Sequence, residues 1–274
     1  MIPAGRVLLD GAMGTALLAA GLPAGALPEE WLLARPEAIG AVHASHAAAG
    51  ARLVLTCTFN LAAPRLEARL DAPSRARAAS LAVKLAREAA PAAQIAGALG
   101  PTALAGPGLR PARAELTERH GRACALLAAA GVDLLWLESQ YDAAEAELAL
   151  EAARATGLEV AITFALRDDG GRLRAPDGTP GEALLLAAEA GGAVATGVNC
   201  VFPGAGLDAL SAWAAAALRI PLALKPSPGL PGAVLGPEAF ARALAPALPH
   251  ARLAGGCCGA TGEHLAALAA AWTR

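Results

Sequence analysis

The stretch Arg252-Leu253-Ala254-Gly255-Gly256-Cys257-Cys258-Gly259 joins a short apolar run to two adjacent cysteines near the end of the chain. A second stretch, Gly197-Val198-Asn199-Cys200, ends another apolar run, Ala193–Val198, with a third cysteine. Short apolar runs that stop at glycine or asparagine are typical of parallel strands buried on both faces. The two stretches therefore predict two buried strands of a parallel sheet, each with cysteine directly after its carboxyl end.

Three cysteines at neighbouring strand ends form a candidate metal site. Thiolates are soft ligands that suit zinc, so Cys200, Cys257 and Cys258 are the predicted ligands of a Zn²⁺ ion. Three protein ligands leave the fourth tetrahedral position open, as in catalytic zinc sites. We expect the flanking glycines to let the backbone bend sharply enough to aim two successive cysteines at one point.

Two other interpretations of the cysteines stay open at this stage. Cysteine often behaves as a small buried hydrophobe, and Cys57 and Cys124 fit that description. The adjacent pair could also be a redox couple, although a disulfide between neighbouring residues is strained. No CxxC spacing supports zinc on its own.

Beyond these two stretches, the whole chain alternates short apolar runs with longer helical segments. The predicted strands are Arg6–Leu9, Arg52–Thr56, Gln94–Ala98, Asp133–Leu137, Leu158–Phe164, Ala193–Val198, Leu222–Leu224 and Arg252–Ala254. The predicted helices are Pro36–Ala49, Ser74–Ala89, Ala114–Ala130, Ala143–Ala155, Gly181–Ala190, Leu207–Ala217, Pro237–Ala247 and Gly262–Trp272. Eight alternating pairs without a linker predict one α/β domain over residues 1–274, a single (β/α)8 TIM barrel. A doubly wound open sheet is the alternative. The loop Arg167–Pro180 is rich in turn formers and predicts a mobile strand-to-helix connection.

Charge and hydropathy limit the partners and the location. The 274 residues carry a net charge of −2, which argues against nucleic acid or an anionic membrane surface as a partner. Apolar runs are interrupted before they reach membrane-spanning length, and Ala12–Ala20 lacks the basic start of a signal peptide. An odd number of cysteines without a secretion signal fits a reducing compartment, so we expect a cytoplasmic protein.

Polar residues follow several of the predicted strands, at the barrel face where chemistry collects. Besides the cysteines they are Asp10-Gly11, Thr56, Glu138 and Asn199. Each has a structural alternative: Asp10 could cap a helix, Glu138 could be a solvated strand end, and Thr56 and Asn199 could be strand or turn residues. Their common position at one rim favours a functional site.

The histidines predict less. His43 and His46 are three residues apart on a predicted helix that packs outside the barrel, so surface or packing roles are expected for both. His120, His250 and His264 lie on or beside helices without an evident partner.

Taken together, these residues resemble the zinc-dependent homocysteine S-methyltransferases over essentially the whole chain. The motifs that carry the resemblance are Asp10-Gly11-Ala12-Met13-Gly14-Thr15, Thr56-Cys57-Thr58-Phe59-Asn60, Gly97-Ala98-Leu99-Gly100-Pro101-Thr102, Glu138, Gly197-Val198-Asn199-Cys200 and Gly255-Gly256-Cys257-Cys258-Gly259. The family's members are (β/α)8 barrels. The resemblance implies methyl transfer to the thiol of homocysteine, which gives methionine.

The resemblance also implies roles for individual residues. Cys200, Cys257 and Cys258 would ligate zinc, Asp10 and Glu138 would bind the amino group of homocysteine, and Thr56 would help to hold its amino-acid end. Gly11 and Asn199 complete the expected substrate site. The thiol of homocysteine, whose ordinary pKa is near 8.5, would lose its proton when it binds at the open position of the zinc. The two carboxylates would orient the ammonium of the substrate.

The methyl donor is less closely determined. Family members use S-methylmethionine, betaine or a cobalamin-bound methyl group. Betaine recognition needs an aromatic cage, whereas Asn60 stands where betaine-dependent members have tyrosine, and Tyr141 is the only tyrosine. The segments Thr56–Asn60, Gly255–Gly259 with Glu263-His264, and Pro226–Pro231 resemble the homocysteine-binding barrel module of cobalamin-dependent methionine synthase, although Lys225 and Ser227 depart from it. A methylcobalamin protein or S-methylmethionine is therefore the expected donor.

The sequence also allows two other classes of function. The chain could be a zinc- and thiol-binding barrel subunit that is inactive without a separate methyl-carrying partner. It could also use Cys200 or Cys258 as a covalent nucleophile, but no histidine stands at a strand end to act as the base.

Overall fold

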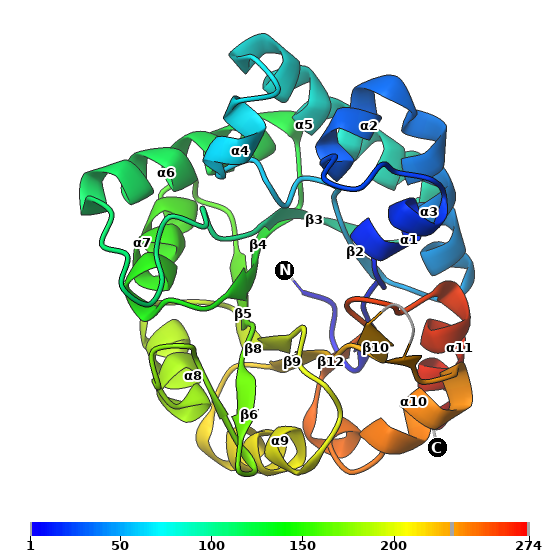
Figure 1. The fold of residues 1–274 in the computed structure, drawn as a ribbon. Coiled ribbons are helices and arrows are strands. Elements are labelled where there is room, and N and C mark those ends of the chain that lie inside the picture. Colours follow the sequence, from blue (N-terminus) through cyan, green and yellow to red (C-terminus); the bar gives the residue numbers. More distant parts are fainter. Residues whose placement is uncertain (1, 231–232, 273–274) are drawn as a thin grey trace.

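Eight parallel strands form a closed barrel in the computed structural model, which describes residues 2–230 and 233–272 (Figure 1). The barrel strands are β1 (Val7–Leu8), β2 (Leu53–Leu55), β3 (Gln94–Leu99), β4 (Leu134–Gln140), β5 (Val160–Phe164), β8 (Ala195–Asn199), β9 (Leu222–Lys225) and β12 (Leu253–Ala254). They pair in the order β1-β12-β9-β8-β5-β4-β3-β2. A parallel bridge between Leu9 and Leu53 joins the two ends of this order and closes the ring.

Eight helices follow the barrel strands and surround them (Figure 1). They are α3 (Pro36–Ala48), α5 (Ala72–Ala89), α6 (Arg113–Ala130), α7 (Ala143–Arg154), α8 (Gly181–Ala190), α9 (Ala205–Ala217), α10 (Pro237–Leu244) and α11 (Gly262–Trp272). The (β/α)8 barrel predicted from the sequence is confirmed, and the alternative of an open sheet is excluded by the closing bridge.

Local sequence signals account for several of these boundaries. Asp71 and Asp142 precede α5 and α7, and each accepts a hydrogen bond from a backbone N–H of the first turn. Helix α6 ends at Gly131, which has a positive φ of 85°.

Additional elements follow four of the strands, on the side of the barrel where the strands end. They are α1 (Gly14–Ala19), α2 (Pro28–Ala34), α4 (Pro64–Glu67), the hairpin β6 (Arg167–Asp169) and β7 (Arg172–Arg174), and the hairpin β10 (Gly229–Leu230) and β11 (Ala233–Val234). A 3-10 turn, Leu248–His250, precedes β12. None of these was predicted, because they are shorter than the periodic segments that sequence patterns report. Pro231, the last residue of the segment Pro226–Pro231, lies outside the described residues.

The connection after β5 differs from the mobile loop that its composition predicts. Its first part is an antiparallel hairpin, in which Asp169 pairs with Arg172 around Gly170 and Gly171. Both glycines have positive φ angles, 59° and 84°, as a two-residue type I′ turn requires. The same turn formers that indicated a loop therefore build a regular hairpin.

The hydrophobic core has an inner and an outer part. Inside the barrel, Trp136 is fully buried among small side chains from neighbouring strands, and Ile2 packs into the same cluster. The alanines of this inner cluster are Ala96, Ala98, Ala161, Ala195 and Ala223. Outside, larger apolar side chains pack between strands and helices. This double burial explains why the strands have apolar residues on both faces.

Within residues 2–230 and 233–272, no helix combines the length and the apolar character that crossing a bilayer requires.

Candidate active site

A cavity of about 410 Å³ opens at the ends of the barrel strands. It is lined by residues that follow β1, β2, β8 and β12, by two residues within β4, by the last residues of β2 and β9, and by the segment that contains α1 and α2. The predicted site residues Asp10, Gly11, Thr56 and Glu138 and the three predicted zinc ligands all line it. Asn199 does not line the cavity.

The three predicted zinc ligands form a compact sulfur cluster on one side of the cavity. The sulfur atoms of Cys200, Cys257 and Cys258 all lie within 4.8 Å of one another, and 3.8 Å separates those of Cys200 and Cys258. Three sulfurs bound to one tetrahedral zinc at about 2.3 Å are about 3.8 Å apart. The cluster could therefore hold a metal ion with small adjustments. Cys57 lines the cavity without joining this cluster, and Cys124 is buried on α6.

Burial keeps the thiols protonated in the absence of a cation. The pKa of Cys257 is raised to about 12 by its hydrogen bond with Cys200 and by burial. A cation is needed to stabilise the thiolates, because its charge favours the ionised form. Metal binding at this cluster must therefore release protons.

Close packing of the backbone explains the glycines of the cysteine motifs. A Cβ at Gly255 would lie 2.6 Å from the carbonyl oxygen of Asp10, and a Cβ at Gly256 would lie 2.2 Å from the Cβ of Ala260. Neither glycine is among the residues with positive φ. Gly255 and Gly256 thus provide space for close packing, whereas Gly259, on the other side of the cysteines, has a positive φ of 85° and provides the bend expected from the sequence.

A bulge in β4 carries Glu138 to the cavity. Leu137 pairs with Ile162 and Gln140 pairs with Phe164, so two residues of β4 face one residue of β5. The second bulge residue, Ser139, has a φ of 58°. Both Glu138 and Ser139 consequently line the cavity.

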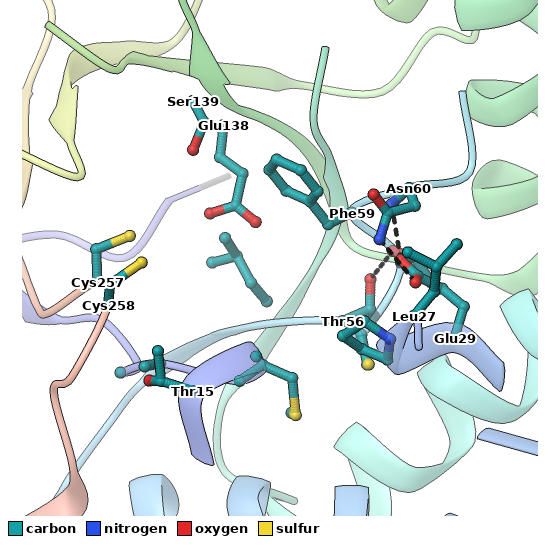
Figure 2. A pocket seen from close by; sticks show the side chains of 18 of the residues that line it. Thr15, Leu27, Glu29, Thr56, Phe59, Asn60, Glu138, Ser139, Cys257 and Cys258 are labelled. Atoms are coloured by element: carbon teal, nitrogen blue, oxygen red, sulfur yellow. Dashed lines mark hydrogen bonds between the residues drawn. The ribbon is translucent and has the colours of Figure 1, made fainter. Parts of the chain in front are cut away.

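The carboxylate of Glu138 points into the cavity, opposite the sulfur atoms of Cys257 and Cys258 (Figure 2). Burial raises its pKa, and the nearby Lys225 partly offsets this effect. In the described part of the chain, no side chain or backbone N–H donates a hydrogen bond to this carboxylate. Glu138 is therefore a carboxyl group available to a ligand, and not a solvated strand end.

Asn199 is fully buried and uses its amide within the protein. Its Oδ1 accepts a hydrogen bond from the backbone N–H of Ser139 at 2.8 Å, and its Nδ2 donates to Ser139 Oγ at 2.6 Å. Nδ2 also lies 3.8 Å from the sulfur of Cys257. Asn199 thus connects the Glu138 bulge to the cysteine cluster from below the cavity surface.

The hydroxyl of Thr56 also makes hydrogen bonds within the protein. Its Oγ1 accepts from the backbone N–H of Ala98 at 3.1 Å and lies 2.6 Å from Oγ1 of Thr58. Thr58 donates to the carbonyl oxygen of Ala98, so Thr56 must donate to Thr58. One lone pair of the Thr56 hydroxyl remains for a donor group of a ligand.

Lys225 is a cavity residue whose role the sequence did not predict. It is the last residue of β9, only 3% exposed, and its Nζ lies 2.6 Å from Oδ1 of Asp10. Burial would lower its pKa, but the carboxylates of Asp10 and Glu138 outweigh burial and raise it, so Lys225 is charged. Because lysine is almost never fully buried without a partner, the available signal was a lysine that directly ends an apolar run.

The histidines lie away from the sulfur cluster. His43 and His46 are buried on the inner side of α3, which confirms a packing role, and burial lowers the pKa of His43 to about 4. The expectation that His120 and His264 lack partners is wrong. His120 pairs with Glu145 at 2.9 Å, and His264 bonds to Thr261 and to the carbonyl oxygen of Leu235.

Comparisons with known proteins agree with this geometry. The family model for homocysteine S-methyltransferase matches residues 7–272. The homocysteine methyltransferase MmuM from Escherichia coli has a similar structure. Its oxidized form is 27% identical with a TM-score of 0.82, over 97% of this chain and 95% of that chain. Its metallated form is 28% identical with a TM-score of 0.81, over 97% and 96% of the two chains.

A more distant similarity concerns the fold alone. The carboxyl transferase domain of Rhizobium etli pyruvate carboxylase is 13% identical with a TM-score of 0.58, over 93% of this chain and 41% of that chain. This identity is too low to indicate a shared activity.

The fold and the site define a (β/α)8-barrel enzyme with a three-cysteine cluster at the carboxyl ends of its strands. The chain belongs to the homocysteine S-methyltransferase family. Its reaction is the methylation of homocysteine, with homocysteine and a methyl donor as substrates.

Proposed function

We propose that the protein is a zinc-dependent homocysteine S-methyltransferase that acts as a single barrel domain over residues 1–274, with S-methylmethionine as its methyl donor. The single observation that carries the proposal is the sulfur cluster of Cys200, Cys257 and Cys258 facing an acidic cavity. The thiolate donor set suits zinc better than it suits hard cations such as Mg²⁺. When bound, zinc supplies a positive charge that lowers the pKa of a coordinated thiol.

The other residues of the cavity bind and orient homocysteine. Glu138 lies opposite the sulfur cluster and accepts hydrogen bonds from the ammonium of the substrate. The remaining lone pair of Thr56 Oγ1 accepts a hydrogen bond from the same amino-acid end of the substrate. Gly11 allows the loop after β1 to pack closely against Ala260, because a Cβ at this position would lie 2.6 Å from the carbonyl oxygen of Ala260.

Asn199 positions two of these groups without touching the substrate. Its hydrogen bonds hold the Ser139 end of the bulge, and its amide lies against Cys257. In this proposal, Asn199 sets the distance between the ammonium-binding carboxylate and the reacting thiol.

The cavity favours a small donor. Its volume of about 410 Å³ is within the range of pockets for small molecules. A corrin ring would have to remain outside such a cavity, and a methylcobalamin protein is therefore the alternative donor. Among the described lining residues Phe59 is the only aromatic side chain, which argues against the cage that betaine would need.

The first test is a direct assay of the donor. Purified, zinc-loaded protein is incubated with homocysteine and, in parallel, with S-methylmethionine, betaine and methylcobalamin, and methionine is measured. We expect turnover with S-methylmethionine. Turnover with methylcobalamin alone would overturn the donor assignment, and no turnover with any free donor would support a subunit that needs a methyl-carrying partner.

The second test concerns the zinc site. Cys200→Ala, Cys257→Ala and Cys258→Ala should each lose most of the bound zinc and all methyl transfer, because two thiolates bind zinc far more weakly than three. Cys124→Ala, which removes a buried thiol on α6, is the matched control and should retain zinc. Metal content by elemental analysis gives the result independently of activity, and a zinc-replete Cys258→Ala variant would refute the site.

A further inference from the structure

The floor of the cavity contains a buried ion pair between two residues 215 positions apart. Lys225 extends from the end of β9 to the loop after β1, where its Nζ donates to Oδ1 of Asp10 at 2.6 Å. Both side chains are at least 95% buried, and both line the cavity. The pair is therefore part of the substrate site and not of the surface.

Both carboxylate oxygens of Asp10 already have partners. Oδ2 accepts a hydrogen bond from the backbone N–H of Leu55 at 2.7 Å, and Oδ1 accepts from Lys225. The ammonium of Lys225 is chemically the same group as the amino group of homocysteine. At Asp10, the protein thus holds an ammonium ion of its own.

Glu138 differs from Asp10 in the partners of its carboxylate. It lines the same cavity, and among residues 2–230 and 233–272 no donor is bonded to its carboxylate. Asp10 and Lys225 together carry no net charge, so the ionised form of Glu138 gives this part of the cavity one negative charge. One substrate ammonium neutralises that charge, whereas burying an unpaired charge is costly.

We propose that Lys225 is a specificity-determining residue that occupies the Asp10 half of the ammonium site, so that Glu138 alone binds the amino group of the acceptor thiol. This inference rests on the proposed function and refines the expectation that both carboxylates bind the substrate. Selection of an amino thiol over a plain thiol then depends on Glu138 and on Lys225 being held by Asp10, so that it does not compete for Glu138.

The experiment compares two acceptors on the same variants. Homocysteine and 4-mercaptobutanoate differ only in the α-amino group, so the ratio of their kcat/KM values measures recognition of the ammonium. Where turnover of 4-mercaptobutanoate is too slow, its inhibition constant against homocysteine replaces kcat/KM. The ratio is measured for wild type, Glu138→Gln, Asp10→Asn, Lys225→Met and the Asp10→Asn/Lys225→Met double variant, after zinc content is shown to be equal.

The proposal predicts that the variants change this ratio in opposite directions. Glu138→Gln should lower the ratio by about 10- to 100-fold, the value of a charge-assisted hydrogen bond. Lys225→Met frees Asp10 for the substrate and should raise the ratio, whereas Asp10→Asn releases Lys225 to compete for Glu138 and should lower it. The double variant should return the ratio to within about threefold of wild type, because the changes at paired residues are not additive.

The variants are chosen to preserve the local structure. Asparagine at position 10 retains an acceptor for the N–H of Leu55, and methionine retains the length of the lysine stem. A double variant that discriminates as poorly as Glu138→Gln would show that Asp10 binds the substrate directly, and a lowered ratio in Lys225→Met would equally refute the proposal. Failure of the proposed function is a separate outcome, since wild type would then fail to methylate homocysteine.

Discussion

Two residues next to the cavity have backbone conformations that only glycine adopts readily. Ser139 and Cys200 have φ angles of 58° and 55°, and only one other described non-glycine residue, Ala103, has a positive φ. Such conformations cost on the order of 1–3 kcal/mol each and persist where the surroundings enforce them. Here the enforcing contacts are those of Asn199 with Ser139 and of the backbone N–H of Cys200 with the carbonyl oxygen of Lys225.

His43 makes the protein sensitive to acid. It is fully buried, and neither ring nitrogen has a hydrogen-bond partner within the described residues. Burial lowers its pKa to about 4, although the negative charge of Asp10 acts to raise it. The unfolded chain binds a proton at this residue below about pH 6.5, but the folded protein does so only near pH 4. The free energy of unfolding should therefore fall by about 3 kcal/mol as the pH falls through this window.

The test compares urea unfolding of wild type and His43→Leu between pH 7 and pH 4. Leucine does not titrate, so the variant should lose about 3 kcal/mol less than wild type over this range. His250→Gln, at the 3-10 turn, is the control and should follow wild type. Identical pH profiles for wild type and His43→Leu would contradict the prediction.

At the scale of elements, the site depends on a link between strands that are not neighbours. Strand β5 lies between β4 and β8 in the barrel, yet Asn199 at the end of β8 bonds to Ser139 of β4. The bulge in β4 brings Ser139 within reach. The ammonium-binding residue and the first cysteine motif are thus held in one hydrogen-bonded unit.

Asn199→Ala should damage stability and the metal site together. The buried N–H of Ser139 would lose its acceptor, at a cost of about 1–3 kcal/mol, and Cys257 would lose its neighbouring amide. We expect a lower urea midpoint and weaker zinc binding, measured by competition with a chelator. Ser211→Ala is the matched control, since it removes a buried hydroxyl whose one hydrogen-bond partner in the described part of the chain is Leu207 within α9. Unchanged zinc affinity in Asn199→Ala would show that the link does not position Cys257.

At the scale of the whole molecule, the barrel interior holds one indole, that of Trp136, among alanines and leucines. Trp136 is fully buried in the barrel interior, and its Nε1 donates to Thr163 at 3.1 Å. Five alanines of the same cluster cannot extend to fill the space that a smaller residue would leave.

Trp136→Ala should therefore destabilise the entire fold. Loss of the indole leaves a cavity and an unpaired Thr163, with an expected cost of about 3–5 kcal/mol in the free energy of unfolding. Trp213→Ala on α9, where the indole is only partly buried, should cost less. Equal effects of the two substitutions would indicate that the barrel interior rearranges.

Much of the fold was predictable because its signals are local. Buried parallel strands require continuous apolar runs and the covering helices require longer amphipathic segments, so all eight strand–helix pairs could be located within a few residues. The hairpin after β5 could not, because glycines and aspartates predict a turn without indicating whether the flanking residues pair.

The candidate site was predictable as a set of residues but not as an arrangement. The cysteines, Asp10 and Glu138 could be placed at one rim, because parallel strands of a barrel end on the same side. Whether Asp10 was free could not be predicted, since its partner Lys225 is 215 residues away.

By itself the sequence determined the eightfold alternation, the rim at which the polar residues gather and the family to which the chain is similar. These properties depend on periodicity and on short motifs, which lie within short continuous stretches of the sequence. Only the tertiary structure decided that Lys225 neutralises Asp10, that a bulge turns Glu138 into the cavity, and that Asn199 lies beneath the surface. Each of these depends on the distance between segments far apart in the chain, and such distances are set when the barrel closes.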